Sequence, residues 1–328
     1  MTSPPALTVL TPVYNGAAWI RETLDSVMAQ AGVAIEHIVL DDGSTDDLAG
    51  ALAPYMGQIR LERHANMGEA ATVNRGIALA SHPLVAVVNA DDPVLPGWAE
   101  AMTGAMASDP ALAAAYPDWR KIDAEGATLE AVRCAEFSLE MAFGQHFCIP
   151  GPGAVLRPAI LGNEKVRDPA RRTSSDFDLW LRLGLRGPIR RVPRVLATWR
   201  QHAGGASSAA RGRAMAEDKI GTARAFLARS DLPPGIRTLA GQGLSAAYVN
   251  AAMLGLRARG IPVSRYVLAS YWHCLRWAPG VLRQQRRSPP HLLYAAAQPV
   301  SGWLHRAASP FLPGRFRHDA MLAQCFGR

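Results

Sequence analysis

Apolar and amphipathic segments alternate along the first hundred residues of the chain. Four short runs have the length and pattern of strands, at residues 6–14, 36–42, 58–64 and 83–88. The segments between them place apolar side chains at helical spacing, at residues 17–30, 46–56 and 68–80. This alternation predicts βαβ units, and therefore an α/β fold built on a largely parallel sheet.

Polar clusters follow three of the predicted strands. They are Thr11–Asn15, Asp41–Ser44 and Asn89–Asp92. Ligands of open α/β sheets bind beyond the carboxyl ends of the strands. We therefore expect the three clusters to meet along one rim of the sheet and to form a binding site there.

The pattern changes near residue 206. From about Ser207 onward the chain is alanine-rich and helical in pattern, with interruptions that contain proline. A length of 328 residues suffices for one large domain or two ordinary ones. We predict a first domain over residues 1–206 and a helical, arginine-rich C-terminal region over residues 207–328.

The composition is that of a globular protein. Hydrophobic residues make up 49% of the chain and charged residues 19%, and the mean hydropathy is zero. No run approaches the roughly 18 apolar residues of a membrane-spanning helix, and residues 1–7 lack the apolar core of a secretory signal. The four cysteines show no paired spacing, which favours reduced thiols and predicts a cytoplasmic location.

Two adjacent acids, Asp91 and Asp92, come directly after the fourth predicted strand. Two carboxylates at one strand end suit a hard divalent cation, Mg²⁺ or Mn²⁺, that also binds phosphate oxygens. Such an ion would stabilise a departing diphosphate. The alternative is a surface turn with Pro93 at its next position, and the motif alone leaves both open.

The other strand ends offer contacts for a nucleotide. Tyr14 presents a ring on which a base could stack, and the Asp42 carboxylate could accept the imide N–H of uracil or thymine. Asn66 and Gly68 come before a predicted helix whose N-terminus suits a phosphate or ribose oxygen. For Tyr14, Asn66 and Gly68, an ordinary turn or helix cap is the alternative.

Two segments further along carry candidate chemistry. Asp176 lies in the first turn of an amphipathic helix predicted over residues 173–187, where it either stabilises the helix or acts as a general base. Arg200 and His202 precede a glycine-rich segment. His202 is a candidate third metal ligand or diphosphate contact, and a role in neither is the alternative.

Taken together, these motifs resemble the family 2 inverting glycosyltransferases of GT-A fold. The segments that carry the resemblance are LTVLTPVYNGAAWIRETLDSV, IEHIVLDDGSTDD, NMGEAATVNRGIALA, VVNADDPVLPG, SDFDLWLRL and ATWRQH. They cover about residues 7–206, roughly two-thirds of the chain. The resemblance implies a GT-A nucleotide-binding sheet with flanking helices, followed here by the helical C-terminal extension.

The resemblance also implies roles for individual residues. Asp176 would be the catalytic base. The predicted donor contacts are Thr11, Tyr14, Asp42, Asn66, Gly68, Asn74, Asp91 and Arg200. The predicted metal ligands are Asp91, Asp92 and His202, with Asp92 favoured as the main one. The chain departs from the family pattern at Asn89, where many members have an acid, and at Ser175, where many have Glu.

The implied activity is the transfer of a sugar from a UDP- or dTDP-linked donor to a hydroxyl of a saccharide or lipid-linked acceptor, in cell-surface polysaccharide or glycolipid assembly. A sugar-nucleotide nucleotidyltransferase is one alternative, but residues 11–19 lack the glycine-rich, basic signature that it requires. A non-catalytic nucleotide-sugar-binding or scaffold protein is another, and the acid pair together with Asp176 speaks against it.

Arginine dominates the end of the chain. From Arg257 onward there are eleven arginines and one acid, Asp319, interspersed with Trp272, Trp277, Trp303 and Phe311. This mixture suits docking on the anionic inner face of the cell membrane, and a solvated helical cap is the alternative. We expect no nucleic-acid partner, because charge alone supports one and no motif does.

Overall fold

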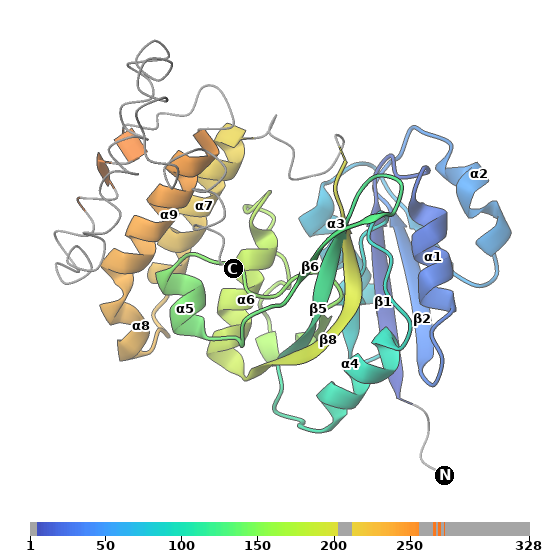
Figure 1. Cartoon of the computed structure of the whole chain (residues 1–328), viewed down its shortest axis with the longest axis horizontal. Coiled ribbons are helices and arrows are strands. Elements are labelled where there is room, and N and C mark those ends of the chain that lie inside the picture. The colour runs from blue at the N-terminus through green and yellow to red at the C-terminus, as the bar shows by residue number, and fades with distance from the viewer. Residues whose placement is uncertain (1–4, 203–211, 256–264, 267, 270–271, 273–328) are drawn as a thin grey trace. The chain divides into compact units, whose positions relative to one another are not determined.

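The computed structural model describes residues 5–202, 212–255, 265–266, 268–269 and 272. The chain divides into two compact units (Figure 1). The first comprises residues 1–143 and 147–206, and the second residues 144–146 and 207–328. The first unit contains every residue predicted to bind the donor, the metal or the acceptor proton.

Four parallel strands form one half of the sheet in the first unit. They are β1 (Ala6–Val13), β2 (Ala34–Asp41), β3 (Arg60–Arg63) and β4 (Val85–Val87). Their order is β3-β2-β1-β4, so β1 and β2 lie in the interior of the sheet. The strands and βαβ connections predicted from the sequence are confirmed here.

The other half of the sheet is mixed. It contains β5 (Ala114–Ile122), β6 (Thr128–Val132), β7 (Val155–Leu156) and β8 (Ile189–Arg200). Strand β7 runs antiparallel to β4 and β5, β6 runs antiparallel to β5, and β8 runs parallel to β5. The sheet is therefore less parallel than predicted, because short antiparallel pairings extend it beyond β4.

Helices cover both faces of the sheet. The described helices of this unit are α1 (Ile20–Met28), α2 (Leu48–Leu52), α3 (Glu69–Leu79), α4 (Trp98–Ala107) and α6 (Ser175–Arg186); α5 (Leu139–Gly144) ends where the second unit takes over. Successive strand residues point to opposite faces. Val9 accordingly joins the core beneath α4, whereas Leu10 joins the core beneath α3.

A glycine lets α3 lie close to the sheet. A Cβ atom on Gly76 would come within 2.5 Å of Leu40 Cδ1 and within 2.9 Å of Leu10 Cδ1. Both leucines are fully buried. The close approach fixes α3, and with it the loop that precedes its first residue, against the ends of β1 and β2.

The second unit is helical where it is described. Helices α7 (Gly212–Leu227), α8 (Pro234–Thr238) and α9 (Ala240–Gly255) surround a core that includes Ala216, Ile220, Tyr248 and Ala251. Among the described helices, none has the length and apolar character needed to cross a membrane. Trp272 is 59% exposed; Trp277, Trp303 and Phe311 lie outside the described residues.

Candidate active site

Asn15 joins the loops that leave β1 and β2. Its backbone is left-handed, with φ of 55°, and its side-chain oxygen accepts the N–H of Thr45 at 2.8 Å. Its own N–H donates to Ser44 Oγ at 3.0 Å. Tyr14, the residue before Asn15, lies at this rim with 54% of its surface exposed. The sequence motif indicated Tyr14 as a possible base contact. It did not show that Asn15 connects this loop to the loop that follows β2.

Asp42 lies at the end of β2, between the exits of β1 and β3. Its carboxylate is 4% exposed and accepts the N–H groups of Met67 at 2.6 Å and Gly68 at 2.9 Å. The Asn66 amide donates to the Asp42 carbonyl at 3.0 Å. The structure therefore brings together three predicted donor contacts. Oδ1 also lies 3.4 Å from His64 Nδ1, so the remaining lone pair of Oδ2 is the one that a further donor would use.

Two predicted donor contacts have other partners. Thr11 is fully buried within β1, and its hydroxyl lies 2.9 Å from His37 Nε2. The Thr11 side chain therefore points into the protein, and a donor contact by Thr11 stays a prediction. Asn74 pairs both ends of its amide with the backbone of Arg167, at 2.7 Å and 2.9 Å. This pairing favours a structural role for Asn74.

The two acids of the pair differ sharply in environment. Asp92 is 4% exposed, and its oxygens accept the Arg200 N–H at 2.8 Å and the Asn89 amide at 3.0 Å. Burial, together with the charge of Asp91, raises the pKa of Asp92 to about 7. The Asp91 side chain is 29% exposed, and its Oδ2 lies 2.9 Å from His202 Nε2. Asp91 therefore has the more accessible carboxylate, although the sequence analysis favoured Asp92 as the main metal ligand.

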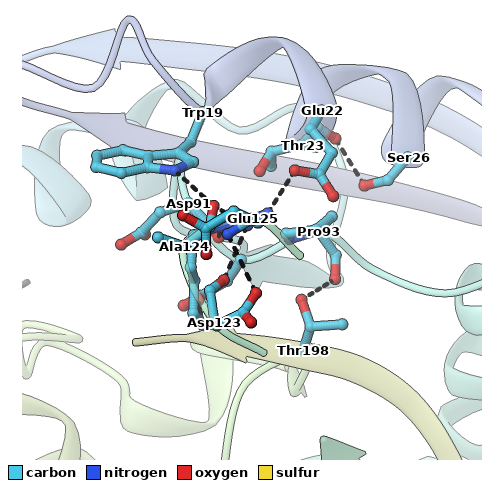
Figure 2. A network of polar contacts seen from close by, with 12 residues as sticks. Trp19, Glu22, Thr23, Ser26, Asp91, Pro93, Asp123, Ala124, Glu125 and Thr198 are labelled. Carbon is cyan, nitrogen blue, oxygen red and sulfur yellow. Dashed lines mark hydrogen bonds and ion pairs between the residues drawn. The ribbon is translucent and has the colours of Figure 1, made fainter. Parts of the chain in front are cut away.

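Arg200 ties the acid pair to the rest of the unit. Its Nε donates to the Asp91 carbonyl at 3.0 Å, and its Nη1 donates to the carbonyls of Asp123 and Ala124 at 3.1 and 2.9 Å. Its Nη2 pairs with the Glu22 carboxylate. Figure 2 shows these partners gathered from α1, the β5–β6 turn and the segment after β4. The prediction that Arg200 contacts the diphosphate is not supported, because its donors are engaged within the protein.

Trp19 fixes the ring of His202. The two ring centroids lie 4.1 Å apart with planes tilted by 40°, and the indole N–H donates to the Ala124 carbonyl at 3.4 Å. Sequence reasoning used Trp19 only as a helix residue. Its place beside the His202 ring depends on the β5–β6 turn, which no local motif indicates.

Strand β8 delivers Arg200 and His202 to the acid pair. The Thr198 hydroxyl donates to the Pro93 carbonyl at 2.6 Å, and the Leu95 N–H donates to the Leu196 carbonyl at 2.8 Å. The segment 93–95 is thereby attached to the end of β8. The proline after the acids, which had allowed a surface-turn interpretation, lies buried beneath this contact.

Asp176 lies in the first turn of α6 and is exposed. One carboxylate oxygen accepts the N–H of Phe177 at 2.7 Å. The neighbouring acid of the same turn, Asp178, is buried and pairs with Arg182 at 2.7 Å. Of the two acids, only Asp176 is therefore accessible to a substrate hydroxyl.

Residues 8–154 match the family model described as "Glycosyl transferase family 2". Over these residues, just under half of the chain, the sequence matches the family 2 glycosyltransferases. Over 123 residues the chain is 37% identical to the Escherichia coli K12 glycosyltransferase YibD, and this match covers 36% of each protein. The predicted family and enzyme class are confirmed, and the chain spans about a third of this relative's length.

Solved structures of glycosyltransferases have the same fold as this chain. TarS from S. aureus, in complex with UDP-GlcNAc, has a TM-score of 0.67 at 17% identity, over 89% of this chain and 87% of TarS. The mannosyltransferase PcManGT from Pyrobaculum calidifontis, in complex with GDP-Man and Mn²⁺, has a TM-score of 0.53 at 17% identity, over 92% and 89%. The predicted GT-A fold is confirmed.

The ligand atoms at the acid pair fit a divalent cation held jointly with a substrate. Within the described ranges, no group of three or more His, Cys, Asp or Glu side chains is arranged to hold an ion. Asp91 and His202 instead offer one carboxylate and one imidazole at a single point. Mn²⁺ accepts both ligand types, and Mg²⁺ commonly takes few protein ligands beside phosphate oxygens and water.

Proposed function

We propose that the protein is a metal-dependent, inverting glycosyltransferase that uses a UDP- or dTDP-linked sugar. Its acceptor would be a hydroxyl of a saccharide or lipid-linked molecule in cell-surface polysaccharide or glycolipid assembly. The observation that carries this proposal is the Asp91–His202 pair at the end of β4, two strands away from the buried Asp42 carboxylate.

The strand order supports the donor assignment. Asp42 follows β2 and Asp91 follows β4, with the end of β1 and Tyr14 between them. Two strand spacings separate the acids by about 10 Å. An extended nucleoside diphosphate is of comparable length. The base would stack on Tyr14 and donate its imide N–H to Asp42, and the phosphates would lie towards Asp91.

Asp91 and His202 would hold Mg²⁺ or Mn²⁺, with Asp92 positioning the turn beneath them. The bound ion would offset the charge that develops on the departing diphosphate. Trp19 and Arg200 would keep the two ligands in place. PcManGT binds Mn²⁺ with its donor, which is consistent with this assignment.

Asp176 would act as the general base. Its carboxylate takes the proton of the acceptor hydroxyl while that oxygen bonds to the anomeric carbon of the sugar. The bond from that carbon to the diphosphate oxygen breaks on the opposite face, and the electron pair leaves with the diphosphate. The product therefore has the inverted anomeric configuration.

A donor screen tests the proposal. UDP-, dTDP- and GDP-sugars are added to the full chain with Mn²⁺ or with EDTA, and the thermal midpoint is measured. We expect UDP- or dTDP-sugars to raise the midpoint when Mn²⁺ is present. A response to GDP-sugars alone would overturn the base assignment, and equal responses in EDTA would overturn the metal assignment.

Membrane docking by the C-terminal arginines stays a proposal of the same kind. Their phosphate-binding charge is the support for it, and a membrane surface is where a lipid-linked acceptor would be found. Flotation with anionic liposomes at low and high salt tests it. Equal recovery with neutral and anionic vesicles would contradict docking by charge.

A further inference from the structure

Arg167 is a buried cation with unused hydrogen-bond donors. Its side chain belongs to a residue that is 9% exposed, and its Nε and Nη1 have no hydrogen-bond partner among the residues that the structure describes. The adjacent acid does not compensate it, since Asp168 accepts the Ala170 N–H at 2.9 Å and lies 3.7 Å from Arg171 Nε. A buried charge without a partner is costly, so its retention requires a reason.

The backbone around Arg167 is held from two sides. Asn74 of α3 bonds both the N–H and the carbonyl of residue 167. Arg182 of α6 donates to the carbonyls of Lys165 at 2.8 Å and Val166 at 2.9 Å. The position of residue 167 is therefore set by two helices, so the missing contacts are not explained by a loosely held segment.

The two helices that hold residue 167 begin at residues of the proposed donor and acceptor sites. Helix α3 starts directly after Gly68, whose N–H binds the Asp42 carboxylate. Helix α6 starts eight residues after Arg167 and carries Asp176 in its first turn. A donor whose base lies at Asp42 and whose phosphates lie towards Asp91 would present its anionic part to a cation held between these two helices.

We propose that Arg167 binds a phosphate oxygen of the donor diphosphate. This inference rests on the proposed function and assigns the cation that Arg200, engaged within the protein, does not supply. A guanidinium binds phosphate oxygens strongly, and the unused Nε and Nη1 of Arg167 lie on different edges of the group, so each can donate to a separate oxygen. The residue would thus be uncompensated only when the donor is absent.

The test compares ligands with and without phosphate on matched variants. Uridine, UMP, UDP and inorganic pyrophosphate are titrated calorimetrically in excess Mg²⁺ onto the full wild-type chain, Arg167→Met, Arg167→Lys and Arg172→Met. Arg172 is exposed in the same loop and serves as the control. We expect Arg167→Met to weaken UDP binding roughly tenfold to a hundredfold and to leave uridine binding unchanged. Arg167→Lys should restore part of the loss.

The stability of the ligand-free variants gives an independent measurement. Arg167→Met should keep or raise the thermal midpoint, because methionine needs no polar partner there. A lowered midpoint, or an equal loss of uridine and UDP binding, would show that Arg167 is structural and would overturn the inference. Unchanged UDP and pyrophosphate binding would overturn it too.

If the wild-type chain binds pyrophosphate but no uridine compound, the base assignment of the proposed function fails. The Arg167 assignment is then decided by pyrophosphate alone, through the loss expected in Arg167→Met. If the wild-type chain binds neither, both assignments fail.

Discussion

Two buried arginines of the first unit are in opposite situations. Arg200 lies at the acid-pair corner and donates to three carbonyls and one carboxylate. Arg167 lies in the loop before α6, and two of its nitrogens have no partner in the described part of the chain. The difference teaches how to separate a cation that builds a site from one that awaits a ligand. Both side chains are buried, and the two residues differ in whether their N–H donors have partners within the protein.

The largest expected effect is the loss of transfer on replacing Asp176, against which the effects at the two arginines can be compared. Asp176→Asn should lower transfer roughly 10²- to 10⁴-fold, because the amide cannot take the acceptor proton. UDP binding should be retained. Transfer is measured with the donor found in the screen, and Glu100→Gln, in the first turn of α4, is the matched exposed control. Loss of donor binding in Asp176→Asn would instead indicate a structural role.

Replacing Arg200 should damage stability where replacing Arg167 does not. Arg200→Met leaves Glu22 unpaired and the Asp91, Asp123 and Ala124 carbonyls without their donor, so we expect a loss of roughly 3–5 kcal/mol in the free energy of unfolding. Urea denaturation measures it, with Arg167→Met alongside. Equal losses in the two variants would remove the distinction between the arginines.

His37 contrasts with both arginines, because a buried imidazole can lose its proton and become neutral whereas a guanidinium stays charged. Burial lowers the pKa of His37 to about 4, from an ordinary value of 6.5. Protonation therefore favours the unfolded chain. The stabilisation is complete above pH 6.5 and is lost as the pH falls through 4, by up to roughly 3 kcal/mol.

The variant His37→Gln isolates this effect. Glutamine can still bond the Thr11 hydroxyl but cannot titrate. The free energy of unfolding is measured from pH 7 to pH 4 for both proteins. The difference between them should shrink or reverse as the pH falls. Parallel curves would show that His37 is not the group responsible, and His146, whose pKa burial lowers to about 3, would then be the next to test.

Variants of Asp91 and Asp92 should have different effects, one on metal-dependent binding and the other on stability. Asp91→Asn should weaken Mn²⁺-dependent UDP binding by roughly tenfold or more, because it removes the accessible ligand beside His202. Asp92→Asn should mainly alter stability, since its oxygens bind the Arg200 N–H and the Asn89 amide. Calorimetry with and without Mn²⁺ measures both. The opposite order would restore Asp92 as the main ligand.

The smallest effect is expected at Trp19. Trp19→Ala removes a ring contact worth roughly 1 kcal/mol, so Mn²⁺-dependent UDP binding should weaken a few-fold. Trp19→Phe should recover most of it, because a ring remains beside His202. Tyr14→Ala, measured without Mn²⁺, should weaken base binding through a different route. If Trp19→Phe behaved like Trp19→Ala, the indole N–H to Ala124 would matter more than the ring.

The first half of the sheet and its site residues could be predicted from the sequence. Each strand from β1 to β4 is a short local run followed by its own helix. Tyr14 and Asp42 come directly after β1 and β2, and Asp91 follows shortly after β4. The sequence did not show that the Thr11 side chain points into the protein, where it meets His37. Nor did it show that Asn74 bonds the backbone of Arg167, which lies 93 residues away.

The sequence by itself determined which side chains stand at strand ends and at the start of α6, because periodicity and turn chemistry are local. Tertiary structure decided what those side chains do. Strand β8 pairs with β5 and brings Arg200 to the acid pair, which buries Asp92 and leaves Asp91 beside His202. Asn74 and Arg182 fix the loop that carries Arg167. Such choices depend on contacts between distant segments, where burial and hydrogen-bond partners, rather than residue type, set the role of a charge.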